Sequence, residues 1–262
     1  MEQLVEGATV LAVAWQERGP NGGPAEPSCR YADGKLTGSK GWVAGAGGAR
    51  GFLVVAEGDA GPVLVLAEAG ADGLSVEERR QADGSAMGEL SFSGTPAGEL
   101  ASGGAVRAAL AEAVNDATAL AAAELVGLSE RAFEITLDYI KTREQFDKPI
   151  GSFQVIQHRA VDLNVMCEVA QSGVREALGL MDRETDPKAR ARLASRAKAR
   201  AVTAAKKITR DAIQLHGAVG YTDEFEIALY LNRALVLSAW LGDDAYHRRL
   251  WFEAREEEGA AQ

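Results

Sequence analysis

Residues 142–154 read TREQFDKPIGSFQ and separate two long helical patterns. On the N-terminal side, apolar residues recur every three or four positions, and no proline occurs between Val106 and Lys141. This spacing places the apolar side chains on one face of an α-helix. Pro149 lacks a backbone donor and restricts the residue before it, so the helix is expected to break at residues 147–149. The stretch therefore predicts two long helices joined by a short connection.

Further helical patterns follow this connection. We expect helices over about residues 152–183, 188–216 and 224–257. Asp186-Pro187 and the glycines of residues 217–220 interrupt them. Together with the first helix they predict a C-terminal four-helix bundle of antiparallel neighbours, which we assign to residues 104–262.

Residues 1–103 have a different character, with many glycines and short apolar runs. The clearest strand candidates are Thr9–Ala14, Gly51–Ala56, Val63–Ala67 and Leu90–Phe92. Turn signals such as Asp33-Gly34 separate them. Pro20, Pro24 and Pro27 lie in a Gly/Pro-rich stretch that is typical of a long loop. We therefore expect a small antiparallel β-barrel or sandwich domain ahead of the bundle, and an α+β fold with two domains.

Composition limits the classes of partner. The formal net charge of −10 disfavours a nucleic-acid partner, because phosphate binding requires a basic face. Cys29 and Cys167 match no metal-ligand spacing, so neither a disulfide nor a metal site is expected. The N-terminus lacks the features of a signal peptide, and no apolar run approaches the roughly 20 residues that span a bilayer. We therefore expect a cytoplasmic protein with reduced thiols and no membrane partner.

The connection at residues 142–154 concentrates groups that bind phosphate-bearing ligands. Arg143 offers a bidentate guanidinium, while Gln145 and Gln154 offer amides. Phe146 can cover a nucleobase or ribose face, and the N-terminus of the following helix adds free N–H donors. A simpler interpretation is a capped helical hairpin in which Arg143 pairs with an acidic neighbour. The residues alone leave both interpretations open.

Two blocks resemble signatures of the acyl-CoA dehydrogenase family. The first runs Arg143-x-Gln145-Phe146-x-x-Pro149-Ile150-x-x-Phe153-Gln154, and the second is Gln214-Leu215-His216-Gly217-Ala218-Val219-Gly220-Tyr221. In the β-half, residues 36–45 resemble the family strand that ends in Lys-x-Trp-Ile-Thr-Asn-Gly. Residues 12–19 fall where the family has Ala-Leu-Thr-Glu-Pro-Gly. The resemblance starts at the family's β-domain, so the family's N-terminal helical domain is expected to be absent.

The resemblance implies FAD as the cofactor, shared between two subunits. In this family one subunit's β-domain cradles the flavin ring, and the neighbour's bundle holds the adenosine and pyrophosphate end. That second role falls to Arg143, Gln145, Phe146, Gln154, Gln214, Gly217, Ala218 and Gly220. The small residues among them let the backbone approach a ligand. His158 and His216 lie in the same segments and are expected to pack or line the cofactor rather than transfer protons.

The catalytic carboxylate of the family has no counterpart in this sequence. Its usual place is a Glu-Gly pair on the last helix, and the matching position holds Leu241, which cannot accept a proton. An alternative place on the first bundle helix holds Ala117, with Thr118 where an arginine is usual. Asp116 is adjacent but points about 100° away around the helix. We therefore assign no catalytic residue to this chain.

The expected site of the flavin ring is also altered. Ala44 replaces the threonine that would bond the flavin, and Trp15-Gln16 replaces a Thr-Glu pair. Trp42 is retained, and it either stacks near a flavin or belongs to the core. Residues that serve a neighbour's cofactor thus remain, while those that serve the chain's own active site are missing.

This asymmetry predicts a subunit of a heteromeric FAD-dependent acyl-CoA dehydrogenase. Its partner would be a catalytic acyl-CoA dehydrogenase subunit, in a hetero-oligomer such as one with two copies of each chain. The partner would supply the base and hold most of the acyl-CoA substrate. Two alternatives stay open: a non-catalytic scaffold or regulatory module of such a complex, and a homo-oligomeric dehydrogenase with a relocated base.

Overall fold

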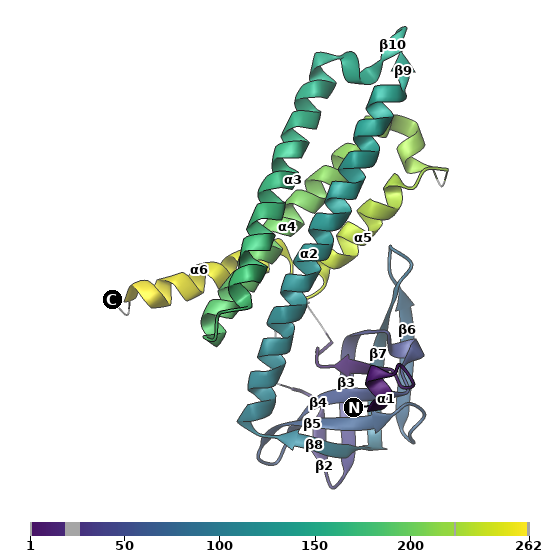
Figure 1. Cartoon of the computed structure of the whole chain (residues 1–262). Coiled ribbons are helices and arrows are strands. Elements are labelled where there is room, and N and C mark those ends of the chain that lie inside the picture. Colours follow the sequence, from purple (N-terminus) through teal and green to yellow (C-terminus); the bar gives the residue numbers. More distant parts are fainter. Residues whose placement is uncertain (1, 19–26, 223, 261–262) are drawn as a thin grey trace. The chain divides into compact units, whose positions relative to one another are not determined.

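The computed structural model describes residues 2–18, 27–222 and 224–260 (Figure 1). The chain divides into two compact units, Met1–Val114 and Asn115–Gln262. Strands make up most of the first unit and helices make up the second, in agreement with the change of sequence pattern near residue 100. The first helix of the bundle begins at Gly104, inside the first unit, and continues into the second. The domain boundary that the sequence places at residue 103 therefore stays a prediction.

The first unit is built on an eight-stranded sheet. After the short helix α1 (Glu2–Val5), the strands are β1 (Leu11–Ala14), β2 (Arg30–Ala32), β3 (Lys35–Ala44), β4 (Gly51–Gly58), β5 (Gly61–Glu68), β6 (Leu74–Arg80), β7 (Ala86–Pro96) and β8 (Gly98–Ser102). Their order is β6-β7-β3-β2-β4-β5-β8, with β1 paired to β4. All strands expected from apolar runs are present. The strands β6 and β8 were not predicted, because they are largely exposed and show no apolar run. Strand β3 shows no apolar run either, because it is rich in polar residues and glycine.

Most neighbouring strands run antiparallel as predicted, but β1 runs parallel to β4, with Leu11 opposite Gly51. A parallel pair cannot be closed by a tight hairpin and needs a long connection. That connection contains β2, β3 and the 3₁₀ turn η1 (Ala46–Gly48). The core of the unit lies between β1, β3, β4, β5 and β7, with Phe52 and Leu90 among its largest side chains. The predicted Pro-rich loop falls largely outside the described residues.

The second unit is a helical bundle. Its helices are α2 (Gly104–Thr142), α3 (Gln154–Met181), α4 (Pro187–His216), α5 (Ile227–Ala239) and α6 (Asp244–Ala260). The predicted bounds of α2, α3 and α4 agree closely with the structure. The single helix predicted over residues 224–257 is wrong, because Leu241 (φ 63°) and Gly242 (φ 101°) adopt left-handed backbone geometry between α5 and α6. No helix among the described residues has the length and apolar character needed to cross a membrane.

Helix α4 is the central support of the bundle. Asp186 caps it, because its carboxylate accepts hydrogen bonds from the backbone N–H groups of Lys188 (3.3 Å) and Ala189 (3.1 Å), and Pro187 fills the first turn. The buried alanines of α4 pack against residues of α2, α3 and α5, among them Leu125, Leu163 and Leu237. The C-terminal ends of α2 and α4 lie at the same end of the bundle (Figure 1), so α4 positions both segments that carry predicted site residues.

Candidate functional site

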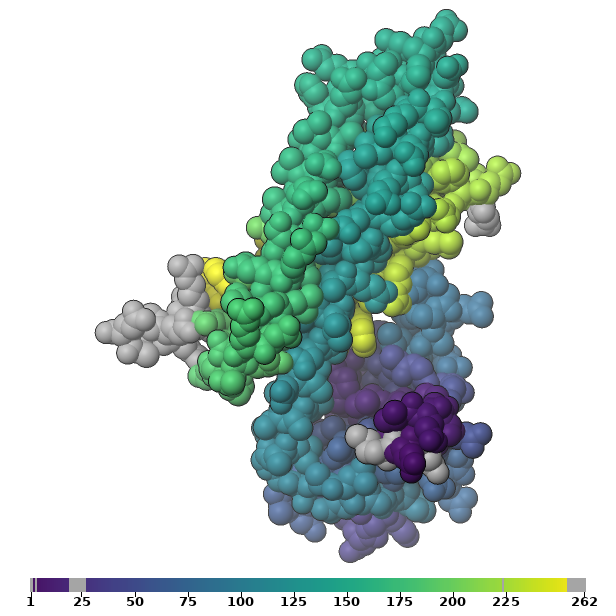
Figure 2. Space-filling view, in the orientation of Figure 1, coloured from purple at the N-terminus to yellow at the C-terminus, as the bar shows by residue number. Residues whose placement is uncertain are grey.

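Residues 143–153 join α2 to α3 and form one tip of the bundle, which is teal to green in Figure 2. The short strands β9 (Glu144–Gln145) and β10 (Lys148–Pro149) pair antiparallel, with Lys148 opposite Gln145. Phe146 (φ 56°) and Asp147 (φ 60°) fill the two central positions, and both adopt the left-handed geometry of a type I′ turn. The predicted break at residues 147–149 is therefore confirmed, and it takes the form of a β-hairpin.

Phe146 is strained and exposed in this hairpin. A phenylalanine in left-handed geometry costs on the order of 1–3 kcal/mol, and such strain concentrates at functional sites. The side chain leaves 86% of its surface exposed. Its ring meets Phe153 edge-on at 6.1 Å, while the Lys148 ammonium lies 4.3 Å from the Phe153 ring centroid. The hairpin thus holds out an aromatic face that the rest of the described chain does not cover.

The polar side chains predicted to bind the cofactor are exposed and largely unengaged. Within the described part of the chain, the side chains of Arg143, Gln154 and Gln214 make no hydrogen bond or ion pair. Among these residues, the alternative in which Arg143 pairs with an acidic neighbour finds no ion pair to support it. Gln145 differs, because its amide nitrogen donates to the Glu144 carbonyl at 2.7 Å. Three of the four polar groups are consequently available to a ligand.

The second predicted segment is the turn after α4. Gly217 caps the helix with φ 67°, and its N–H donates to the carbonyls of Ile213 and Gln214. The short 3₁₀ turn η3 (Gly217–Tyr221) follows. A Cβ at Gly220 would lie 3.0 Å from the Ile213 carbonyl oxygen, so a side chain at this position would crowd the end of α4. The conformation and packing of the turn therefore account for glycine at positions 217 and 220. Ala218, by contrast, is an exposed residue of the turn.

Tyr139, which lies one helical turn before Arg143 on α2, contacts His216 next to the second segment. The Tyr139 ring stacks on the His216 ring with centroids 4.2 Å apart, and the Tyr139 hydroxyl donates to the His216 carbonyl at 3.2 Å. His216 is buried and packs as predicted; His158, by contrast, is exposed on α3. Burial lowers the pKa of His216, so its imidazole is neutral at pH 7.

A cleft of about 670 Å³ lies beside the η3 turn, between α3 and α4. Gln214 and Tyr221 line it on one side, and Arg159 and Arg210 bring positive charge. Of the predicted site residues, Gln214 alone lines this cleft. The structure therefore brings Gln214, in the last turn of α4, to a concave surface and leaves the hairpin residues outside it.

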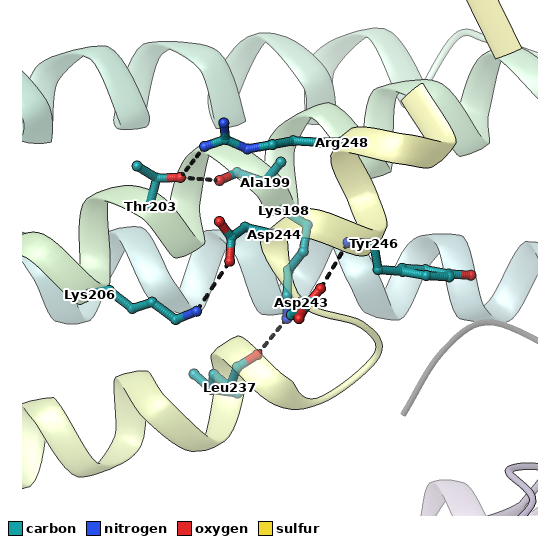
Figure 3. A network of polar contacts seen from close by, with 9 residues as sticks. All are labelled: Lys198, Ala199, Thr203, Lys206, Leu237, Asp243, Asp244, Tyr246 and Arg248. Atoms are coloured by element: carbon teal, nitrogen blue, oxygen red, sulfur yellow. Dashed lines mark hydrogen bonds and ion pairs between the residues drawn. The ribbon is translucent and has the colours of Figure 1, made fainter. Parts of the chain in front are cut away.

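Leu241, the residue that the sequence predicts to replace the family's carboxylate, lies in the connection between α5 and α6 and not on a helix, which corrects the sequence-based placement on the last helix. Leu241 is buried, with 2% of its surface exposed. Lys198 of α4 donates from its ammonium to the carbonyl of Leu237 at 2.6 Å (Figure 3). It also donates to the carbonyl of Trp240 at 2.9 Å, and together the two contacts cap α5. The Leu241 carbonyl accepts a hydrogen bond from His247 Nε2 at 3.0 Å.

This connection is surrounded by buried titratable groups with shifted pKa values. Desolvation lowers the pKa of the Lys198 ammonium to about 7, with Glu124 opposing and Lys206 adding to the shift. Desolvation, and then the charge of Lys198, lowers the pKa of His247 to about 4. His247 is therefore neutral at pH 7, donating from Nε2 and facing the Ser195 hydroxyl at 3.2 Å through Nδ1.

The acidic residues near the base positions are all engaged. Asp243 accepts from the Tyr246 N–H at 2.8 Å, and Asp244 pairs with Lys206 at 3.2 Å (Figure 3). Asp116 accepts a hydrogen bond from the Arg190 guanidinium at 2.7 Å. These contacts describe structural carboxylates.

The first unit shows what remains of the expected flavin-ring site. Trp42 leaves 39% of its surface exposed and sits in a β-bulge of β3 with φ 56°, so the interpretation as a core residue is wrong. Ala44 is exposed at the end of β3 and offers no side-chain donor. Lys40 is fully buried and pairs with Glu17, which also accepts from the Ser28 hydroxyl.

The described residues contain no disulfide and no group of side chains that could hold a metal ion. Cys29 and Cys167 are free and buried, and burial raises the pKa of each thiol to about 11. Thiols with raised pKa values are poor nucleophiles at pH 7. Across the part of the chain that the structure describes, no three His, Cys, Asp or Glu side chains gather as a metal site would require.

Sequence reasoning missed Tyr139, Lys198 and His247. Tyr139 lies one helical turn before Arg143, and its position inside a helical pattern suggested only packing. Lys198 carried a usable signal, because it interrupts an alanine-rich buried face of α4. A lysine on such a face requires acceptors, and here they are carbonyls at the end of another helix.

Comparisons with known proteins agree with this fold. Residues 105–254 match the family model described as "Acyl-CoA dehydrogenase, C-terminal domain". The acyl-CoA dehydrogenase IpdE2 of Mycolicibacterium smegmatis is 37% identical over 118 residues, which are 45% of this chain and 35% of that protein. The matched segment thus spans little more than a third of this curated relative.

Solved structures match nearly the whole chain. A variant of the Tcur3481-Tcur3483 steroid acyl-CoA dehydrogenase is 31% identical with a TM-score of 0.84, covering 99% of this chain and 70% of that one. The ChsE4-ChsE5 complex from Mycobacterium tuberculosis is 25% identical with a TM-score of 0.82, covering 99% of this chain and 68% of that one. Both structures pair two differently named chains.

Proposed function

Because the chain belongs to the acyl-CoA dehydrogenase family, a family of FAD-dependent oxidoreductases, we propose that it is a subunit without a catalytic base in a heteromeric acyl-CoA dehydrogenase. The subunit contributes the adenosine and pyrophosphate half of a shared FAD site. A partner subunit supplies the flavin-ring half, the base and most of the acyl-CoA pocket.

One contrast carries this proposal. Arg143, Gln154 and Gln214 leave donors without partners in the described chain, as a site completed by a ligand from another subunit requires. At the base position, by contrast, Leu241 is buried and offers no proton acceptor. A chain that keeps cofactor donors and lacks a base can support catalysis only on a neighbour's flavin.

The residues present fit the adenosine and pyrophosphate end of FAD. The Arg143 guanidinium would neutralise pyrophosphate charge through a bidentate contact, and the amides of Gln154 and Gln214 would add neutral donors. The exposed Phe146 ring offers a flat apolar face to the adenosine. FAD, when bound, accepts the hydride that leaves the acyl chain. In this chain the residues only bind and orient.

The assembly with a second chain is supported by the solved relatives. The Tcur3481-Tcur3483 enzyme and the ChsE4-ChsE5 complex each pair two differently named chains, and this chain aligns with both over 99% of its length. A partner that carries the missing carboxylate would complete the same arrangement. We therefore expect a co-encoded or co-purifying homologue with a Glu-Gly pair where this chain has Leu241-Gly242.

The test compares flavin content in the assembled complex. The chain is co-expressed with its co-purifying homologue, either unchanged or as Arg143→Ala. Arg200→Ala is the matched control, because Arg200 is an exposed arginine on α4 outside both predicted segments. We expect Arg143→Ala alone to lose bound FAD. Flavin content equal to the control would favour the scaffold alternative and sink the shared-site proposal.

The homo-oligomeric alternative needs a base within this chain. Its best candidate, Asp116, is held by Arg190, so the structure gives this alternative no available carboxylate among the residues considered. The chain purified alone is mixed with FAD, a series of acyl-CoA thioesters and an artificial electron acceptor. Turnover by the chain alone would establish the homo-oligomeric enzyme instead.

A further inference from the structure

The two segments predicted to bind the cofactor are far apart in sequence and are joined at one point. We call this point the Tyr139–His216 clasp: the Tyr139 ring stacked on the His216 ring at 4.2 Å, with the Tyr139 hydroxyl donating to the His216 carbonyl at 3.2 Å. Within the described residues, no other hydrogen bond or ring stack links residues 139–154 to residues 214–222. The clasp is therefore their direct polar connection.

Each half of the clasp is tied rigidly to a candidate ligand-binding residue. On α2, the Arg143 N–H donates to the Tyr139 carbonyl at 2.8 Å, so Arg143 follows Tyr139 by one closed helical turn. On α4, His216 lies between Gln214 and the Gly217 cap, whose N–H returns to the Gln214 carbonyl. A shift of either ring therefore moves a ligand-binding side chain on the same helix.

The His216 ring is fixed in one tautomer and one orientation. Its Nδ1 lies 2.7 Å from the Ala212 carbonyl and must donate there, which leaves Nε2 as a lone-pair acceptor. That Nε2 is buried and has no hydrogen-bond partner among the described residues. Phe225 packs on the ring at a centroid distance of 4.7 Å and also meets Tyr139 edge-on. The imidazole is thus held by one hydrogen bond from Nδ1 and presents flat stacking faces to Tyr139 and Phe225.

We infer that Tyr139 and His216 are positioning residues, which hold the Arg143 hairpin and the Gln214 loop at the spacing that one FAD molecule needs. The inference rests on the proposed shared FAD site. His216 is buried, and Tyr139 is partly buried with its hydroxyl turned to the His216 carbonyl. Their effect passes through Arg143 and Gln214.

Two variants separate the parts of the clasp. Tyr139→Phe keeps the stacked ring and removes only the hydroxyl that donates to the His216 carbonyl. His216→Phe keeps a stacking ring and removes the imidazole nitrogens, while the carbonyl that accepts from Tyr139 stays. Tyr31→Phe is the matched control, because the Tyr31 hydroxyl donates to the Ala97 carbonyl at 3.3 Å in the first unit, outside both segments.

The first measurement is hydrogen–deuterium exchange on the full chain. We expect Tyr139→Phe to raise amide exchange about threefold to tenfold in both segments together, residues 144–152 and 217–222, as loss of one hydrogen bond implies. The second is FAD affinity in the assembled complex. Tyr139→Phe should weaken it by a similar factor. His216→Phe should weaken it less than Tyr139→Phe, because a stacking ring and the accepting carbonyl remain, and Tyr31→Phe should leave it close to that of the unchanged chain.

The outcomes distinguish the clasp from the shared site. If Arg143→Ala weakens FAD binding but Tyr139→Phe does not, the positioning inference is overturned and the proposed function stands. If Arg143→Ala itself leaves FAD binding unchanged, both fail together. Loosening confined to residues 217–222 would also overturn the inference, because a purely local packing contact predicts that pattern.

Discussion

The hairpin end of the bundle and the α5–α6 connection differ in whether their polar side chains are buried and hydrogen-bonded. At the hairpin end, Arg143, Gln154 and Gln214 are exposed and have no partner in the described chain. At the α5–α6 connection, Lys198 and His247 are buried and bonded to backbone carbonyls. The first pattern is typical of a ligand-binding surface. The second is typical of a structural contact, and we call the α5–α6 connection with Lys198 and His247 the joint. We therefore expect substitutions in the two regions to have different consequences.

The largest expected effect is loss of stability at the joint. Lys198→Ala removes a fully buried side chain and leaves two carbonyls without their donor. We expect the free energy of unfolding to fall by about 2–5 kcal/mol, through the cavity and the unpaired carbonyls. Urea unfolding of the purified chain measures this. A change below about 0.5 kcal/mol, the range of ordinary surface substitutions, would show that the joint does not hold the bundle.

The joint should also make stability depend on pH. The pKa of Lys198 is lowered from 10.5 to about 7 in the folded chain, so between these values the unfolded chain binds more protons. Stability therefore rises with pH across this window. From pH 7 to pH 9 we expect a gain of about 2–3 kcal/mol from this group. Urea unfolding of the unchanged chain and of Lys198→Met, which cannot titrate, isolates the effect.

His247 extends the same dependence to lower pH. Its pKa is lowered from 6.5 to about 4, so stability is lost as pH falls from 6.5 towards 4. His247→Gln, which can still donate to the Leu241 carbonyl, should flatten the stability profile in this range. If the free energy of unfolding of His247→Gln falls between pH 6.5 and pH 4 as it does in the unchanged chain, the titrating groups lie elsewhere.

Damage to the hairpin end should act on the cofactor and leave the fold intact. Arg143→Ala removes a charge-assisted contact worth about 1.5–3 kcal/mol, which corresponds to roughly 10- to 100-fold weaker FAD binding in the complex. The free energy of unfolding of the chain alone should change by less than about 0.5 kcal/mol, because the Arg143 side chain has no partner among the residues that the structure describes. Flavin fluorescence and urea unfolding give the two numbers, and a large stability loss would contradict the comparison.

The smallest expected effect is a gain in stability at the hairpin. Asp147 holds φ 60° at the second turn position, where glycine is preferred. Asp147→Gly should raise the free energy of unfolding by about 0.5–1 kcal/mol by relieving this geometry. FAD binding should be unaffected, because Arg143 and Phe146 remain. Thermal unfolding detects the gain, and a loss of stability would show that the Asp147 side chain has a structural role.

Much of the helical unit follows from local signals. Helix α4 begins and ends as predicted because Asp186-Pro187 supplies an N-cap and a first-turn proline, and Gly217 supplies the left-handed C-cap. These choices involve residues within one turn of each helix end, so the sequence shows them directly. The apolar runs of β1, β4, β5 and β7 are equally readable, because each packs one face or both against the core.

The break between α5 and α6 could not be read in the same way. Leu241-Gly242 contains no proline, and leucine rarely adopts a left-handed conformation. The conformation is imposed by Lys198 of α4 and His247 of α6, which bind the carbonyls at the connection. The strands β6 and β8 were missed for a related reason: they are exposed, so their pairing with β7 and β5 leaves no apolar pattern.

The sequence by itself determined the family resemblance, the bundle and the absence of a carboxylate at Leu241, because residue identity and spacing are enough for each. Only the tertiary structure decided that Arg143 and Gln214 are unengaged and joined through Tyr139 and His216, while Asp116 is held by Arg190. The physical reason is that availability depends on partners brought from other helices. A side chain's chemistry is written in the sequence, but whether that chemistry is already satisfied is set by packing.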